Sequence, residues 1–510
     1  MSYVFTAPEM LAKTAGDVKD IGSAISTASA NAAVPTTALV PAAEDEVSAA
    51  IAKLFGAYGE EYQALVAQAE AFHAQFTQTL AAAGTAYTEA EAGNAALMAG
   101  ASSAQTAPNV LSALTTPFQS LLGPTSVGTG GSNGIVALNS VAKATSADPL
   151  VALIMGGTFN PTPDPGYVTN VFNSYIQPNP LFAGATPQGL FTPEQFWPFS
   201  PNLGNLTFGQ SVTQGVTLLD DALRGPTGVL TQGNSAVVFG YSQSATIATN
   251  EIRALMAAGS PYQGQLSFVM IGDPNNPVGG ILERFPGFYI PFLDVPFNGA
   301  TPPNSPYPTS IYTIQYDGVA NAPQYPLNPV SDLNAVMGYF YLHHTYPDLT
   351  AAQVANAVQL PTSPGYTGST DYYMFLTQDL PLVQPIRSIP VLGDPIADIF
   401  QPDLRVLVDL GYGDYGPGLN YANVPTPASL LSVPNPFTVL PDLAIGAVQG
   451  PQAALVDLGL LPQSALPTAY PYLPSLDPGL NFFLGQPSVT GLSLLSGAAG
   501  DVLELIPPIT

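Results

Sequence analysis

The sequence predicts an α/β protein in two parts, an N-terminal antiparallel helical hairpin and a larger domain built on a mostly parallel β-sheet. Two observations lead to this prediction. Apolar residues recur every three or four positions over residues 47–80, the spacing of one face of a long helix. Between residues 150 and 342, short apolar runs alternate with helical segments. Strands separated by helices favour a parallel sheet with helices on both faces.

The composition excludes several classes of function. The 510 residues include 9 Lys and Arg against 35 Asp and Glu, for a formal net charge of −26. So few basic residues argue against binding nucleic acid and against docking on anionic lipid. The chain has no cysteine, so disulfides and thiolate metal sites are not available. We also predict neither a transmembrane helix nor a signal peptide, because no suitable apolar run is present.

Residues 1–100 are rich in alanine and form the predicted hairpin. Thr6 and Glu9 are spaced as a capping box at the start of the first helix. Pro35 and Pro41 mark the turn between the two helices. A hairpin has too little core to be stable alone, so we expect its long apolar stripe to pack against a partner.

Three further segments complete the chain. Residues 101–148 are rich in Ser, Thr, Gly and Pro, which predicts a flexible linker. Residues 149–420 contain the alternating strands and helices of the predicted α/β domain. Residues 421–510 form an extension rich in Pro, Leu and Gly, to which the sequence assigns no core.

A serine lies on the predicted turn between a strand and a helix. Residues 236–239 are an apolar run, the sequence GYSQS follows from residue 240, and a helical segment comes next. A nucleophile elbow requires a sharp turn with small residues two positions before and after the nucleophile. Gly240 and Ser244 occupy those positions around Ser242. The helix N-terminus would favour negative charge that develops beside this serine.

A serine nucleophile needs a general base, and the chain contains three histidines. His73 lies in the hairpin beside aromatic residues and is predicted to be a helix-surface residue. His343 and His344 are the two that follow Ser242. They are adjacent, so we expect only one of them to face the serine.

The acid that orients the histidine should follow a strand between the serine and the histidine pair, because the chain order in α/β-hydrolases is nucleophile, acid, histidine. Asp317 fits best, since the predicted strand at 311–316 leads directly into it. Asp273 also ends a strand, and Asp294 lies between apolar runs. Both remain alternatives.

Two segments are candidates for stabilising an oxyanion. One N–H group would come from Gln243, the residue after the nucleophile. The second would come from the loop after the first predicted strand, where Gly157 offers an unobstructed backbone N–H. The hydroxyl of Thr158 would add a further hydrogen bond.

Two features of the hairpin point to a family. The pair Pro8-Glu9 lies near its start, and Tyr87 and Glu91 are four residues apart near its end. The pattern resembles the PE domain of mycobacteria, and the last two residues match the Y-x-x-x-D/E signal of type VII secretion substrates. The resemblance implies pairing with a PPE-family protein and recognition by a type VII secretion chaperone. It also implies a secreted or cell-envelope location reached without a signal peptide.

The larger domain shows a second resemblance. The sequence GYSQSA from residue 240 is similar to the G-Y-S-Q-G-A elbow of cutinases. Together with further matching runs, it resembles the serine-hydrolase domain called PE-PPE. The resemblance implies a cutinase-like α/β-hydrolase that acts on acyl esters through Ser242, Asp317 and His343, without a metal or cofactor. The further matching runs are 156–158, 272–274, 316–318, 341–346 and 402–412.

The predicted function is therefore a secreted serine carboxylesterase or lipase that hydrolyses an acyl ester or lipid. One alternative is an acyltransferase that moves acyl chains onto lipid or sugar hydroxyls of the cell envelope. Another is a surface or interaction protein without activity. The proline-rich segments 285–308 and 380–402 either line an acyl-binding groove or are ordinary packed loops. We expect the hairpin to be dispensable for catalysis and required for export.

Overall fold

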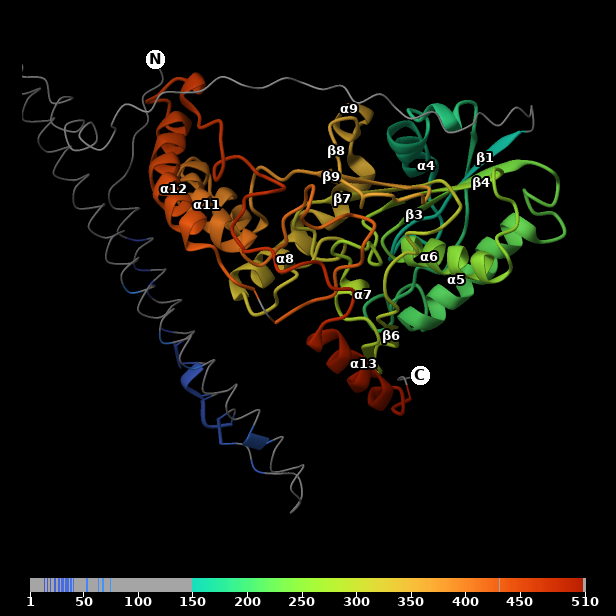
Figure 1. Ribbon diagram of the computed structural model, residues 1–510, viewed down its shortest axis with the longest axis horizontal. Coiled ribbons are helices and arrows are strands. Elements are labelled where there is room, and N and C mark those ends of the chain that lie inside the picture. Colours follow the sequence, from blue (N-terminus) through green and yellow to red (C-terminus); the bar gives the residue numbers. More distant parts are fainter. Residues whose placement is uncertain are drawn as a thin grey trace, which may run out of the picture. The chain divides into compact units, whose positions relative to one another are not determined.

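The computed structural model describes residues 149–430 and 432–507, together with isolated positions between residues 13 and 74. The chain divides into two compact units, Met1–Ala137 and Leu138–Thr510. Most of the isolated positions in the first unit are helical. The second unit contains the sheet and the candidate site, and is described below (Figure 1).

Several predictions for the N-terminal region lie outside the described residues. They include the proposed secretion signal at Tyr87 and Glu91, the histidine His73, and the linker at 101–148. The hairpin as a whole and the domain limits therefore stay predictions.

The second unit is built on a seven-stranded sheet with the strand order β2-β1-β3-β4-β7-β9-β8. Neighbouring strands are parallel except for β8, which pairs with β9 in the antiparallel direction. This arrangement confirms the predicted α/β fold with a mostly parallel sheet. A separate antiparallel pair is formed by β5 and β6. The strands are β1 (Leu150–Ile154), β2 (Thr186–Gly189), β3 (Ser235–Tyr241), β4 (Leu266–Ile271), β5 (Tyr289–Ile290), β6 (Val295–Pro296), β7 (Thr309–Ile314), β8 (Val358–Gln359) and β9 (Thr370–Phe375).

Helices cover both faces of the sheet, with α5 and α6 on one side and α4 and α9 on the other (Figure 1). The α-helices are α4 (Pro165–Val171), α5 (Phe208–Arg224), α6 (Gln243–Ala257), α7 (Ile281–Arg284), α8 (Pro329–Tyr341), α9 (Ala351–Val354), α10 (Gln384–Arg387), α11 (Gly393–Asp409), α12 (Pro436–Asp457) and α13 (Gly491–Leu503). Shorter helical turns are η1 (Phe172–Ile176), η2 (Pro180–Phe182), η3 (His343–Asp348), η4 (Pro381–Val383) and η5 (Gln463–Ala465).

The central strands supply core residues to both layers. Successive side chains of a strand point to opposite faces. On β3, Val238 therefore packs with residues of α5 and α6, while Val237 and Phe239 pack with α4 and η1. Because both faces are covered, the central strands are continuous apolar runs rather than alternating ones.

The C-terminal extension is more ordered than the sequence indicated. Helix α12 packs along α11, and its glycines allow the two backbones to come close. A Cβ atom at Gly446 would lie 2.2 Å from a carboxylate oxygen of Asp403, and one at Gly450 would lie 2.2 Å from the carbonyl oxygen of Ile399. The glycines and two internal prolines that obscure this helix in the sequence are thus compatible with it because α11 supports it.

Candidate active site

The turn between β3 and α6 holds Ser242 in a strained conformation. Its backbone has φ 55° and ψ −116°, a region that residues other than glycine rarely adopt. Gly240 is required because a Cβ there would lie 2.7 Å from the carbonyl oxygen of Ser244. The Ser244 hydroxyl accepts a hydrogen bond from the Tyr241 N–H at 2.8 Å, so the serine that replaces the usual second glycine closes the turn.

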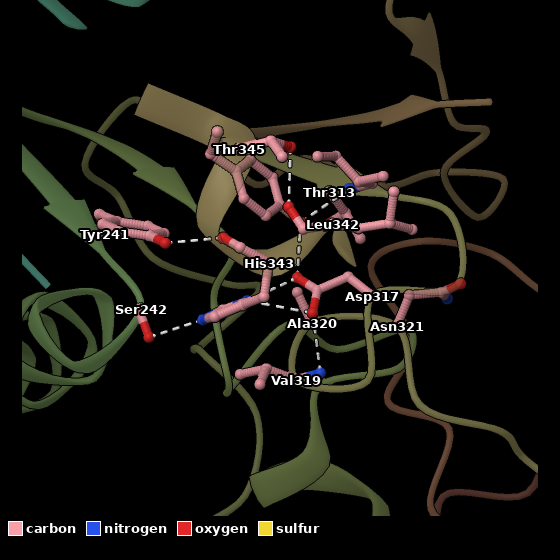
Figure 2. A network of polar contacts seen from close by, with 12 residues as sticks. Tyr241, Ser242, Thr313, Asp317, Val319, Ala320, Asn321, Leu342, His343 and Thr345 are labelled. Atoms are coloured by element: carbon pink, nitrogen blue, oxygen red, sulfur yellow. Dashed lines mark hydrogen bonds and ion pairs between the residues drawn. The ribbon is translucent and has the colours of Figure 1, made fainter. Parts of the chain in front are cut away.

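The side chain of Ser242 contacts one of the two candidate histidines. His343 Nε2 lies 2.8 Å from Ser242 Oγ, and His343 Nδ1 lies 2.9 Å from Asp317 Oδ2 (Figure 2). His343 is 6% exposed, whereas its neighbour His344 is exposed to solvent. The structure thus brings together Ser242, His343 and Asp317 in one hydrogen-bonded chain.

The Asp317 carboxylate is fully buried and held from several sides. Its Oδ1 accepts from the Val319 N–H at 3.0 Å, and its Oδ2 accepts from the Tyr346 hydroxyl at 2.8 Å. The preceding residue, Tyr316, has φ 70°, and its hydroxyl donates to Asp409 at 2.7 Å. These bonds fix the carboxylate so that it can orient an imidazole.

Helix α8 brings His343 to this carboxylate because glycines let it pack closely on the Asp317 turn. A Cβ atom at Gly338 would lie 1.9 Å from the Tyr316 carbonyl oxygen. A Cβ at Gly318 would lie 2.2 Å from the Ala335 carbonyl oxygen. Since α8 ends two residues before His343, this contact sets the position of the imidazole.

The alternative acid Asp273 has a structural set of partners. Its Oδ1 accepts from the Asn275 N–H at 2.9 Å, and its Oδ2 accepts from the Thr301 hydroxyl at 2.8 Å. Burial raises the pKa of Asp273 to about 6, although these two hydrogen bonds oppose the rise. Its carboxylate thus stabilises the turn after β4 and is not hydrogen-bonded to His343.

Asp294, the other alternative, joins two different segments. Its carboxylate accepts from the Thr207 hydroxyl at 2.6 Å and from the Tyr289 hydroxyl at 2.8 Å. Thr207 caps helix α5, so Asp294 connects the start of that helix to the β5–β6 hairpin. It has no hydrogen bond to the histidine either.

The predicted oxyanion donors Gln243 and Gly157 lie on two segments next to Tyr241, one that follows it in the chain and one that packs against it. Gln243 is the first residue of α6, and Gly157 is so close to the end of β3 that a Cβ atom would lie 3.2 Å from the Tyr241 carbonyl oxygen. Within the described ranges, the backbone N–H groups of Gly157, Thr158 and Gln243 donate to no backbone carbonyl. They remain available to a ligand.

The sequence did not identify the segment that links these two donors. The Glu194 carbonyl accepts from the Phe159 N–H at 3.1 Å, and the Gln195 carbonyl accepts from the Gln243 side chain at 2.9 Å. Burial raises the pKa of Glu194 to about 8, against the opposing hydrogen bond from Thr192. A loop glutamate with no local motif offered no signal for this role.

Gly272 is a second residue whose role the sequence did not indicate. It has φ 57°, and a Cβ atom there would lie 3.2 Å from His343 Cε1 and 3.1 Å from the Tyr346 ring. The glycine therefore leaves room for the imidazole directly beside the end of β4.

Two negative findings apply to the described residues. No group of His, Asp and Glu side chains among them is arranged to hold a metal ion. None of the described helices is both long enough and apolar enough to cross a membrane.

The fold and the site define a class of protein, an α/β protein with a mostly parallel sheet and a serine elbow at the end of a central strand. Comparison with known protein families identifies the chain more closely. Residues 4–94 match the model of the PE family, and residues 183–413 match that of the PE-PPE domain. The chain belongs to the PE family and carries a PE-PPE domain, which confirms both resemblances.

Two relatives from Mycobacterium tuberculosis (strain ATCC 25618 / H37Rv) are similar over most of their length. The PE family protein PE3 is 57% identical over 512 residues, covering 100% of both chains. Esterase PE16 is 44% identical over 459 residues, covering 89% of this chain and 77% of its own. Among solved structures, a novel cutinase-like protein from Cryptococcus sp. is similar with 18% identity and a TM-score of 0.24, over 35% of this chain and 82% of its own. That similarity is too weak to bear on the fold.

Proposed function

We propose that this protein is a serine ester hydrolase, a carboxylesterase or lipase, with Ser242, His343 and Asp317 as its catalytic triad. The observation that carries the proposal is the hydrogen-bonded chain from the strained elbow serine through a buried histidine to a buried carboxylate. A relative that is named an esterase and is similar over most of the chain supports the same reaction class.

In the first half of the reaction, Ser242 Oγ attacks the ester carbonyl carbon while His343 Nε2 takes the hydroxyl proton. The carbonyl electron pair moves onto oxygen. The N–H groups of Gln243 and Gly157, with the Thr158 hydroxyl, stabilise that charge. The C–O bond to the alcohol then breaks, and His343 donates its proton to the leaving oxygen.

In the second half, water attacks the acyl-enzyme with His343 again as the base, and the acid leaves as Ser242 is restored. Asp317 keeps the Nδ1–H tautomer of the imidazole and stabilises the imidazolium that forms in both halves. No step requires a metal or cofactor. An acyltransferase would use the same steps with a lipid or sugar hydroxyl in place of water.

A fluorophosphonate probe on the full chain tests the proposal, because an activated serine displaces its fluoride and becomes phosphonylated. Labelling should occur in the wild type and in the control Ser388→Ala, which changes an exposed serine outside the site. It should disappear in Ser242→Ala. An unlabelled wild type would favour the reading of an inactive surface protein. Unlabelled wild type incubated with an ester separates the two reactions: a hydrolase releases free acid, whereas an acyltransferase moves the acyl group to an added sugar or lipid alcohol.

We further propose that the N-terminal region pairs with a PPE-family protein and that the chain leaves the cell through a type VII system and its chaperone. Membership of the PE family supports this context. Tyr87→Ala or Glu91→Ala should then block the appearance of the protein outside the cell while leaving ester hydrolysis unchanged. Normal export of both variants would show that Tyr87 and Glu91 do not direct export.

A further inference from the structure

An apolar groove lies beside the candidate triad. It has three walls, formed by α7, by the loop after Asp317 and by α8, and a volume of about 410 Å³. This volume falls within the usual range for pockets that bind small organic ligands. The residues that matter for the argument are Ile281, Phe285, Val319, Val336, Tyr339 and Phe340.

Two of these walls touch the triad itself. The Tyr339 ring is stacked on the His343 imidazole, with centroids 5.8 Å apart and an interplanar angle of 25°. Val319 donates its N–H to Asp317, and Figure 2 shows its side chain directly below the imidazole in that view. The groove is therefore continuous with the site at His343.

We propose that this groove is the alcohol subsite of the enzyme and accepts esters of apolar aliphatic alcohols, an inference that rests on the proposed function. The reason is the path of the proton. His343 Nε2 must donate to the leaving oxygen, so this oxygen lies within hydrogen-bond reach of Nε2. The group attached to that oxygen then runs along a surface beside the imidazole, and Tyr339, stacked on the ring, forms the part of that surface that opens into the groove.

The lining of the groove selects the chemistry of the alcohol. Its side chains are mainly aliphatic and aromatic, and Val336 and Phe340 remain 52% and 60% exposed. Asp332 also lines it, and burial raises the pKa of that carboxyl to about 6, as expected beside an apolar surface. An alkyl chain that covers these side chains removes apolar surface from water.

A larger cavity of about 600 Å³ is less suited to this role. It lies over α5 and α6, and many of its lining side chains are amides, hydroxyls and the Asp294 carboxylate. None of its lining residues has a hydrogen bond or ring contact with a triad side chain, whereas Tyr339 of the groove is stacked on His343. Size alone would favour this cavity, but polarity and position favour the groove at His343.

Two series of esters on the full chain test the inference. One keeps the acyl group constant, from ethyl acetate to octyl acetate, and the other keeps the alcohol constant, from ethyl acetate to ethyl octanoate. In the wild type, kcat/KM should rise along the alcohol series by up to about fourfold for each methylene that the groove covers. In Val336→Asp, the preference for octyl over ethyl acetate should fall at least about tenfold.

The matched control is Leu333→Asp, which adds the same charge to an equally exposed position of α8 outside the groove. It should retain the preference of the wild type. Val336→Thr, a milder polar change, tests the same wall should the aspartate variant fail to fold. Loss of preference along the acyl series instead, or equal effects of the changes at positions 336 and 333, would overturn the assignment. A wild type that fluorophosphonate does not label would refute the proposed function itself.

Discussion

Two neighbouring strands, β4 and β7, are each followed by a turn of the same kind, yet the aspartates in these two turns have different partners. In each turn a residue with positive φ precedes a fully buried aspartate, Gly272 before Asp273 and Tyr316 before Asp317. Each carboxylate accepts a hydrogen bond from the N–H two residues later, at 2.9 and 3.0 Å. Each also accepts from a hydroxyl at 2.8 Å. Only Asp317 contacts the histidine.

The difference comes from what packs over each turn. Gly338 of α8 packs against the turn at Asp317, and the residues after α8 place His343 on that carboxylate. At the other turn, Gly272 lies beside the imidazole while the Asp273 carboxylate is bonded to Thr301. The same local turn is thus part of the candidate triad in one place and a structural support in the other. The predictions below test this distinction.

The largest loss of activity should come from removing the imidazole of His343, which binds the aspartate of one turn and not that of the other. His343→Ala should lower kcat for a short acyl ester roughly a millionfold, the scale reported for loss of a triad histidine. His344→Ala should stay within about threefold of the wild type, because that side chain is exposed. Steady-state kinetics on both variants provide the measurement. If His344→Ala lost more activity than His343→Ala, the triad histidine would be His344 and the assignment of His343 would be wrong.

The next test compares the two aspartates directly. Asp317→Asn should lower kcat by about ten-thousandfold with little change in KM, because an amide holds the wrong imidazole tautomer. Asp273→Asn should cost less than about tenfold, since its partners are Thr301 and Asn275. If the two variants lose similar activity, the distinction between the turns is wrong.

A smaller effect is expected from Tyr346→Phe, which removes the hydroxyl that donates to Asp317. Loss of the hydrogen bond to the charged carboxylate costs about 1.5–3 kcal/mol, so kcat should fall roughly ten- to hundredfold and the pH profile of kcat should shift. The hydroxyl also accepts from the Ile314 N–H at 2.7 Å, and loss of that second bond lowers stability. Tyr175→Phe is the matched control. Its hydroxyl donates to the Tyr346 carbonyl and not to the carboxylate, so it should change stability more than kcat.

The last prediction concerns stability rather than activity. The Asp273 carboxyl should make the free energy of unfolding depend on pH. Burial raises its pKa from 3.8 to about 6, so between these values the folded protein retains a proton that the unfolded chain has lost. The free energy of unfolding should therefore fall as the pH rises through this window, by up to about 3 kcal/mol. Urea unfolding of the wild type and Asp273→Asn from pH 4 to 7 measures the difference. Parallel curves for the two proteins would contradict it.

Features that depend on neighbours along the chain could be predicted from the residues alone. The elbow at Ser242 is one, because Gly240 and Ser244 are within two residues of it and make the turn possible. The central strands are another, since a strand buried on both faces is a continuous apolar run whatever packs on it. For the same reason the parallel sheet was predictable from the alternation of strands and helices.

Which side chains meet depends on how distant segments pack together. Asp273 and Asp317 have the same local signature, and the choice between them depends on an imidazole 26 residues beyond Asp317 and 101 beyond Ser242. The contacts of Glu194 with the Gly157 loop, the packing of α12 on α11 and the groove beside His343 also join distant segments. Local propensity acts over a few residues. Such contacts appear only when the packing of the sheet and its helices brings these segments together.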